Sequence, residues 1–151
     1  MEYSVKKLSK ADLAFAKQLF IFFQEDDGIA IPTLANDKYL QKLIGNGNYH
    51  VIVALDGDKV IGGVTAYELP MYYGQVNEMF LYEIAVRPEY RRQGIATALI
   101  ESLKIVCGEK GVKIIFVGTE KSNLAAKELY LNTGGAMEII PWFTYTLKGN
   151  K

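Results

Sequence analysis

The chain has little of the chemistry that cysteine and histidine supply, with one residue of each among its 151. A single cysteine, Cys107, excludes an internal disulfide and suits a reducing compartment, so we expect a cytoplasmic protein. With so few soft ligands, no metal site is expected. The sequence shows neither a signal peptide nor an apolar run of membrane-spanning length, and we expect no membrane partner.

The charge balance excludes a second group of functions. Lys plus Arg and Asp plus Glu number 17 each, so the chain has no excess charge of the kind that polyanion binders use. Basic residues gather at Arg87, Arg91 and Arg92 without a wider basic stripe, and we therefore expect no nucleic-acid partner. Half of the residues are hydrophobic and 12% are aromatic, which rules out disorder. A length of 151 residues predicts a single domain over residues 1–151.

Hydrophobic periodicity predicts strands and helices in mixed order. Strands are expected at residues 2–8, 49–55, 59–69, 80–86 and 112–117, and two more at 136–140 and 142–147. Helices are expected before the acidic residues 25–27, at 36–44, after Gly94, and before Gly134. The adjacent glycines at 62 and 63 predict a bulge or a close approach of another segment. This order predicts an α/β (α+β) fold with one mixed sheet and helices on both faces.

Residues 80–103 combine a strand, a basic turn and a helix. Pro88 cannot donate to a strand ladder, so the strand ends before it. Gly94 opens the helix, whose first N–H groups and dipole favour an anion, and a residue without Cβ lets a bulky group approach. The residues alone leave two interpretations open, a phosphate-binding turn or a solvated basic turn. Neither a Walker loop nor a dinucleotide fingerprint occurs in the chain.

Two motifs in this order resemble the GNAT N-acetyltransferases. One is R-x-x-G-x-A at residues 91–96, similar to the acyl-CoA pyrophosphate loop of that family. The other is N-x-x-A-x-x-L-Y at residues 123–130, similar to the helix after its fifth strand. The resemblance covers residues 49–135 and implies the GNAT fold, a mostly antiparallel twisted sheet with splayed central strands. It also implies acetyl-CoA as co-substrate.

The resemblance further implies where acetyl-CoA is held. The backbone of the fourth strand would bind pantetheine, the turn and first helical residues would bind the pyrophosphate, and an amide would reach a pantetheine carbonyl. The residues implied are Ile84, Ala85, Val86, Arg91, Arg92, Gln93, Gly94, Ile95, Ala96, Thr97 and Asn123.

Two side chains are candidates for the proton transfers of acetyl transfer. Glu83 lies inside a buried strand, where burial would raise its pKa toward the range useful for a base. It could instead be a rim carboxylate or pair with an arginine, and Glu78 is the second candidate. Tyr130 occupies the GNAT tyrosine position and suits the acid that protonates the departing sulfur, although it could also be an ordinary core tyrosine.

The acceptor amine is predicted from a narrower resemblance. The runs AYELP, LYEIAV and RRQGIATALI, within residues 51–104, look like the type I aminoglycoside 3-N-acetyltransferases. That family has an acidic run before the tyrosine helix, whereas this chain has GTEKS at 118–122, and Lys121 opposes a cationic substrate. Acids that could line the site of a polycation are Glu25, Asp26, Asp27, Glu78, Glu83 and Glu120.

Three alternatives stay open at this point. The acceptor could be another small amine or a protein amine, and a non-catalytic acyl-CoA-binding regulator is a different class altogether. The presence of both Glu83 and Tyr130 counts against the regulator. A homodimer is expected, because GNAT enzymes commonly pair, through the aromatic C-terminal strands.

Overall fold

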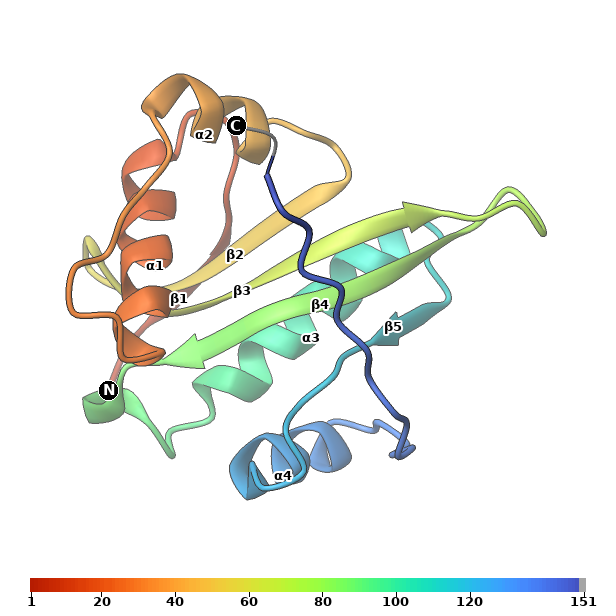
Figure 1. Cartoon of the computed structure of the whole chain (residues 1–151). Helices are drawn as coiled ribbons and strands as arrows, with labels where there is room; N and C mark the ends of the chain where they lie inside the picture. Colours follow the sequence, from red (N-terminus) through yellow and green to blue (C-terminus); the bar gives the residue numbers. More distant parts are fainter. Residues whose placement is uncertain (150–151) are drawn as a thin grey trace.

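The computed structural model describes residues 1–149, and its centre is one five-stranded sheet with the strands in sequence order (Figure 1). Neighbouring strands from β1 to β4 are antiparallel, whereas β5 runs parallel to β4. The mixed, mostly antiparallel sheet confirms the predicted fold class. The strands are β1 (Ser4–Lys7), β2 (Tyr49–Asp56), β3 (Lys59–Pro70), β4 (Asn77–Val86) and β5 (Ile114–Phe116).

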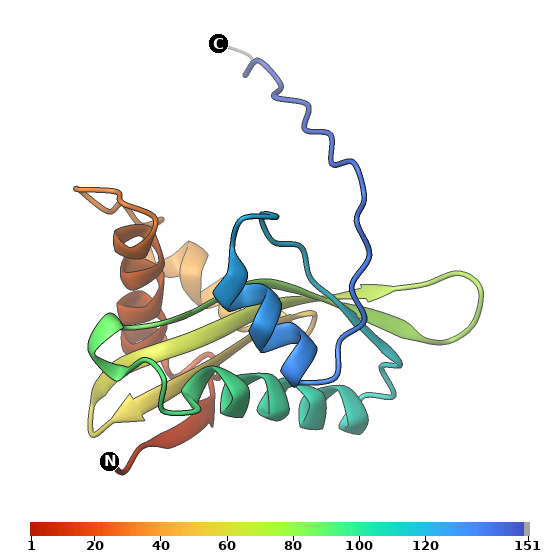
Figure 2. The same cartoon turned by 90° about the horizontal axis from the view of Figure 1, so that it is seen from below.

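Helices cover both faces of the sheet (Figures 1 and 2). One face carries α1 (Leu13–Asp26) and α2 (Asp37–Ile44), and the other carries α3 (Ile95–Glu109) and α4 (Leu124–Asn132). A short 3₁₀ turn, η1 (Pro88–Tyr90), links β4 to the turn before α3. Within residues 1–149, no helix combines the length and the apolar character needed to cross a bilayer.

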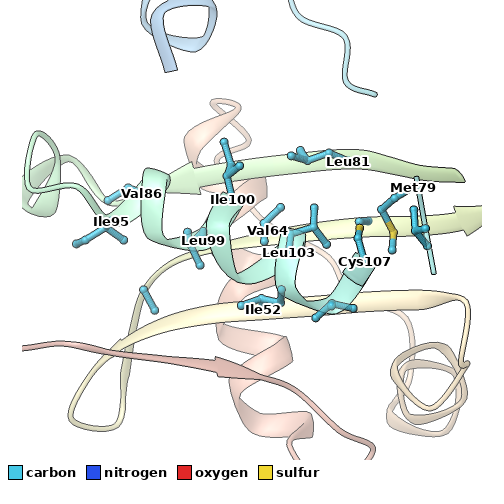
Figure 3. Packing of buried hydrophobic residues seen from close by; sticks show 14 of the residues in the cluster. Ile52, Val64, Met79, Leu81, Val86, Ile95, Leu99, Ile100, Leu103 and Cys107 are labelled. Carbon is cyan, nitrogen blue, oxygen red and sulfur yellow. The ribbon is translucent and has the colours of Figure 1, made fainter. Parts of the chain in front are cut away.

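Each face has its own hydrophobic core. On the α3 side, the apolar stripe of α3 packs against β2, β3 and β4 (Figure 3), and Cys107 is buried there as a packing residue. On the α1 side, α1 packs against the alternate residues of β2. The labelled residues of the first core include Ile52, Val64, Met79, Leu81, Leu99 and Leu103.

The glycine pair in β3 permits the close approach that the sequence predicted. A Cβ at Gly63 would lie 2.5 Å from Leu19 Cδ1, and a Cβ at Gly62 would lie 2.8 Å from the Ala85 carbonyl oxygen. Real Cβ atoms cannot tolerate such contacts, so a larger residue at Gly63 would push against α1, and one at Gly62 would push against β4. Gly63 therefore permits the close packing of α1 on the sheet, and Gly62 permits the close approach of β4 to β3.

A buried acid and histidine join β2 to β3. His50 Nε2 lies 2.8 Å from Glu68 Oε1, and both side chains are almost fully buried. Burial lowers the pKa of His50. Burial raises the pKa of Glu68, but hydrogen bonds from Asn77 and His50 outweigh it and the pKa is lowered overall. The pair therefore favours neutral His50 and ionised Glu68.

The two strands predicted at 136–140 and 142–147 are absent, and this prediction was wrong for the single chain. Residues 136–149 have no regular secondary structure, all are exposed, and the segment extends away from the body of the protein (Figure 2). Strand-forming side chains make a strand only when another strand lies beside them. Nothing in the described part of this chain takes that position.

Candidate active site

The last six residues of β4 have a strand on one side only. β3 pairs with β4 as far as Val86, whereas β5 pairs only as far as Phe80, opposite Phe116. Beyond that point the chain after β5 diverges from β4 (Figure 1). The splay of the central strands is therefore present. Ile84, Ala85 and Val86, the residues predicted to bind pantetheine, lie beside the gap.

The turn before α3 has the geometry of an anion site. Gly94 has a φ of 79°, and a Cβ built there would meet nothing within 4 Å. The Ala98 N–H donates to the Gly94 carbonyl at 3.0 Å. The N–H groups of Ile95, Ala96 and Thr97 come before that bond and point out of the helix end. With the helix dipole, they favour a phosphate group.

The two arginines of the turn have different contacts. Arg91 Nε donates to the Val86 carbonyl at 2.8 Å, and its Nη2 donates to Asp26 Oδ1 at 2.8 Å. Arg92 is 83% exposed, and its guanidinium is 3.9 Å from Glu128 Oε2. Arg91 therefore anchors the turn to β4 and α1, and Arg92 is the arginine that stays accessible to a phosphate. Gln93, also exposed, lies between Arg92 and Gly94.

A pocket of about 220 Å³ opens on the α1 side of the sheet and contains Glu83. Its other lining residues come from α1 and its C-terminal end: Phe20, Phe23, Gln24 and Asp27. Burial raises the pKa of the Glu83 carboxyl, and the negative charge of Asp27 raises it further. A half-buried carboxyl of this kind is suited to take a proton near neutral pH.

The acidic cluster at 25–27 is divided among different partners. Glu25 Oε2 is 3.9 Å from Arg87 Nη1, and Asp26 is the acid bound to Arg91. Asp27 is the member of the cluster that lines the pocket. Two of the three charges thus neutralise arginines of the same chain, and one remains to attract a cation beside Glu83.

The other two predicted substrate acids lie outside this pocket. Glu78 is near the start of β4, opposite Leu69 and Ile114. It is five residues from Glu83, which corresponds to roughly 16 Å along a strand. Glu120 is exposed in the loop between β5 and α4. The structure therefore brings Asp27 together with Glu83, but not Glu78 or Glu120.

Tyr130 lies on the opposite face of the sheet from Glu83. It packs against the core on the α3 side, and burial raises the pKa of its hydroxyl. Asn123 caps α4, with its Oδ1 accepting from the Ala126 N–H at 3.1 Å, which leaves its amide nitrogen able to donate. The gap beside β4 therefore has a carboxyl on one face and a phenol on the other.

Comparison with known proteins identifies the scaffold. A profile of the Acetyltransferase (GNAT) family matches residues 16–134. The chain belongs to the GNAT family. The prediction of an acyltransferase is thereby confirmed at the level of the family.

Solved structures and curated relatives give different acceptors. An aminoglycoside acetyltransferase, meta-AAC0020 from an uncultured soil metagenomic sample, is 33% identical in its complex with trehalose, covers 97% of both chains and has a TM-score of 0.92. The same enzyme is also known in complex with sisomicin. N-alpha-acetyltransferase 30 of Schizosaccharomyces pombe is 35% identical over 82 residues, which cover 54% of each chain. The ribosomal protein bS18-alanine N-acetyltransferase of Escherichia coli is 39% identical over 59 residues, which cover 39% of this chain and 40% of the relative. The chain thus spans about half the length of these curated relatives or less.

A row of aromatic rings beside Glu83 was missed by the sequence analysis of this GNAT chain. The ring centroids of Tyr49 and Tyr67 are 4.9 Å apart, those of Tyr67 and Tyr82 5.5 Å, and those of Tyr82 and Phe80 5.6 Å. A register shift opposite Thr65/Ala66 leaves Tyr82 unpaired. This bulge places Tyr82 and Glu83 on the same face, whereas simple alternation predicts opposite faces.

Proposed function

We propose that this chain is an acetyl-CoA-dependent N-acetyltransferase that acts on an aminoglycoside, at its 3-amino group. The observation that carries the proposal is the pocket in which Asp27 lies with Glu83, on the α1 side of β4. Two carboxylates attract an ammonium group, and the aromatic row beside Glu83 suits a cation or the flat face of a sugar ring. The similarity to a solved aminoglycoside acetyltransferase over 97% of both chains supports the same acceptor class.

The cofactor half of the site fits acetyl-CoA. The open glycine, the free N–H groups of residues 95–97 and the accessible Arg92 suit the pyrophosphate. The gap beside β4 suits the pantetheine arm, which would hydrogen-bond the backbone of Ile84 and Val86 as an added strand does, because the Ala85 carbonyl oxygen faces Gly62 of β3 instead. The Val86 carbonyl already accepts from Arg91, so the Val86 N–H is the group left to the ligand at that residue.

The residues of the site divide the chemistry between the two faces. Glu83 takes a proton from the substrate ammonium, and the neutral nitrogen attacks the thioester carbonyl. A backbone N–H of β4 aimed at the carbonyl oxygen would stabilise the developing oxyanion by about 3–4 kcal/mol. When the C–S bond breaks, the Tyr130 hydroxyl donates a proton to the thiolate of CoA, and the second proton that the nitrogen loses as it becomes an amide restores the phenol. Residues 1–151 would act as one catalytic domain, within a homodimer.

A protein α-amine is the second candidate acceptor. The local similarity to two protein N-acetyltransferases favours it. A peptide N-terminus carries one ammonium followed by an extended backbone, so it gains from Glu83 but has less need of a second carboxylate. An aminoglycoside carries several ammonium groups, and Asp27 should therefore matter more for it.

Release of the CoA thiol from acetyl-CoA over a panel of amines tests the proposal. The panel contains sisomicin, a polyamine and short peptides with free N-termini. We expect the largest kcat/KM with sisomicin and acetylation at the 3-amino nitrogen by mass spectrometry and NMR. Turnover of peptides without turnover of any aminoglycoside would overturn the acceptor assignment. CoA binding without thiol release for any amine would instead show a non-catalytic regulator.

Asp27→Asn tests the role of the pocket charge in this proposal. We expect a higher KM for sisomicin, most clearly at low salt because screening weakens attraction beyond about 8–10 Å, with acetyl-CoA affinity unchanged. Asp58→Asn, at an exposed acid in the turn after β2, is the matched control and should leave both unchanged. A sisomicin KM indifferent to Asp27→Asn at every salt concentration would show that the substrate is not held there.

A further inference from the structure

The aromatic row crosses the sheet on the face that carries the acceptor pocket, and no proton transfer of the proposed reaction uses it. Tyr49 of β2 is followed by Tyr67 of β3, and Tyr67 by Tyr82 of β4. Phe80 of β4 then stacks on Phe116 of β5, with ring centroids 4.9 Å apart and planes within 10°. The aromatic rings therefore span the four neighbouring strands from β2 to β5 (Figure 1).

The exposed part of the aromatic row lies beside Glu83. Tyr82 is 56% exposed and Tyr67 37% exposed, although both belong to inner strands of the sheet. Tyr82 directly precedes Glu83, and the bulge puts the two side chains on one face. Phe80 and Phe116 are the last pair before β4 and β5 separate. A molecule whose amine reaches Glu83 therefore has exposed aromatic rings beside it.

Neighbouring rings hold Tyr82 in place. Its ring makes an angle of 85° with that of Tyr67 and the same angle with that of Phe80, which is the edge-to-face arrangement that aromatic pairs prefer. A side chain fixed in this way loses little conformational freedom when a ligand binds. Burial raises the pKa of the Tyr67 hydroxyl, and the nearby hydroxyls of Tyr82 and Tyr39 raise it further. The Tyr67 hydroxyl is therefore neutral at physiological pH.

We propose that Tyr82 and Tyr67 form a second acceptor subsite, which holds a sugar ring of the aminoglycoside other than the ring that carries the reacting amine. This inference rests on the proposed function and adds a specificity-determining role for the two tyrosines. Their rings offer apolar area to the C–H face of a sugar ring and attract its ammonium groups. Their hydroxyls can hydrogen-bond its polar groups. Glu83 lies next to the subsite, at the ring that reacts.

The position of the subsite favours a sugar ring over the other candidate amines. A peptide binds best along a strand edge, where backbone N–H and C=O groups are free. The two tyrosines instead lie on the face of inner strands and offer ring surface. A polyamine has ammonium groups but no ring, so it gains charge attraction from Asp27 and Glu83 and less from the tyrosines. The subsite therefore selects acceptors that have more than one ring.

The number of rings in the acceptor tests the subsite. Sisomicin has several rings, and 2-deoxystreptamine is the single ring that carries the 3-amino group in such compounds. Tyr82→Ala should lower kcat/KM for sisomicin roughly 3–30-fold more than for 2-deoxystreptamine, which is the contribution of one aromatic contact with a cation. The loss should be in KM, and it should persist at high salt because screening mainly weakens attraction over longer distances. An unchanged ratio of the two kcat/KM values would overturn the subsite, whether both values fall equally or neither falls.

Two further variants separate the ring of Tyr82 from its hydroxyl and from general effects of removing a tyrosine. Tyr82→Phe keeps the ring and should keep most of the preference for sisomicin; a Phe variant as poor as the Ala variant would overturn recognition by the ring. Tyr72→Ala removes a tyrosine that is 98% exposed in the turn between β3 and β4, outside the aromatic row, and should keep the wild-type ratio. Circular dichroism and a cooperative thermal transition establish that each variant is folded.

Calorimetric titration of the CoA-loaded protein with sisomicin separates this inference from the proposed function. Tyr82→Ala should raise the Kd of sisomicin by the same roughly 3–30-fold. If that rise occurs but the wild type does not acetylate sisomicin, the subsite stands and the proposed function is overturned. If the wild type acetylates sisomicin but Tyr82→Ala changes neither the Kd nor the kcat/KM ratio, the proposed function stands and the subsite is overturned. Absence of sisomicin binding to the wild type would overturn both.

Discussion

Substitutions of Gly94 separate backbone strain from phosphate repulsion at the start of α3. Because Gly94 has a φ of 79° and open space around a built Cβ, Gly94→Ala introduces left-handed strain without a clash. That strain costs about 1–2 kcal/mol, or a fall in Tm of about 2–8 °C for a chain of this length. Gly94→Asp has the same strain but places a carboxylate at the positive end of the helix dipole, which stabilises the fold by about 0.3–1 kcal/mol. Without ligand, the Asp variant should be no less stable than the Ala variant.

The two variants should separate when acetyl-CoA binds. A carboxylate about 5 Å from one phosphate charge costs about 3 kcal/mol at an effective dielectric constant of 20, which raises Kd roughly a hundredfold. The Kd of the Ala variant for acetyl-CoA should rise about tenfold or less. Isothermal titration calorimetry measures the Kd of both variants. Gly111→Asp is the control, since Gly111 also has a positive φ of 69° and open space but lies beyond the other end of α3. Equal Kd values for the Ala and Asp variants would refute phosphate binding at this turn.

Three further predictions concern titrating groups. Glu83→Gln should lower kcat by about 10²–10⁴-fold and flatten the acidic limb of the pH–rate profile; the same behaviour in Glu78→Gln instead would move the base to Glu78. Tyr130→Phe should reduce kcat more than acetyl-CoA affinity, and an unchanged kcat would make Tyr130 a packing residue. The His50–Glu68 pair should make the protein less stable in acid, because both groups have lowered pKa values in the fold and bind protons more readily when unfolded. The free energy of unfolding should fall as pH drops below the ordinary His pKa of 6.5 and again below the Glu pKa of 4.5. In urea unfolding, His50→Gln should lack the loss of stability near pH 6.5. If the variant loses stability there as the wild type does, another group causes that loss.

The raised pKa of Glu83 has the opposite consequence for stability. A carboxyl whose folded pKa is above its unfolded value favours the fold below the unfolded pKa, and that contribution is lost as pH rises through the folded pKa. Near neutral pH the buried charge therefore opposes folding, and Glu83→Gln should raise Tm while it lowers kcat. This combination is typical of a residue kept for function at a cost in stability.

The parts of the fold that local chemistry determines were predictable. Pro88 ends a strand and Gly94 opens a helix for reasons that lie within a few residues of each, and the structure has β4 ending at Val86 and α3 beginning at Ile95. The splay beside β4 was predicted from family resemblance rather than from periodicity. No property of the β4 sequence itself indicates that β5 stops pairing at Phe80.

Two features of the site depend on contacts that sequence spacing does not show. The pairing of Asp26 with Arg91 joins residues 65 positions apart, and no local pattern distinguishes it from a solvated acidic turn. The bulge at Tyr82 changes which side chains share a face with Glu83. Strict alternation would place Tyr82 on the other side, so the aromatic row could not be found without the register.

The C-terminal residues show a third limit of sequence reasoning. Their propensity for strand was identified correctly, but propensity describes what a segment can form when a partner is present. The described part of the single chain offers residues 136–149 no partner, so the segment is extended and exposed. The prediction of two strands was therefore wrong for the isolated chain, although the propensity on which it rested was identified correctly.

Asp26 and Asp27 are adjacent in sequence but belong to different halves of the site. Asp26 holds Arg91, which also binds the Val86 carbonyl, so it supports the turn before α3. Asp27 lines the pocket with Glu83 and raises the pKa of that carboxyl. Neutralising Asp26 should therefore weaken acetyl-CoA binding by loosening the turn, whereas neutralising Asp27 should weaken binding of a cationic acceptor. A variant that changes both acids would alter acetyl-CoA binding and acceptor binding together. The two single substitutions distinguish them, because Asp26 should affect acetyl-CoA affinity and Asp27 should affect the KM of the acceptor.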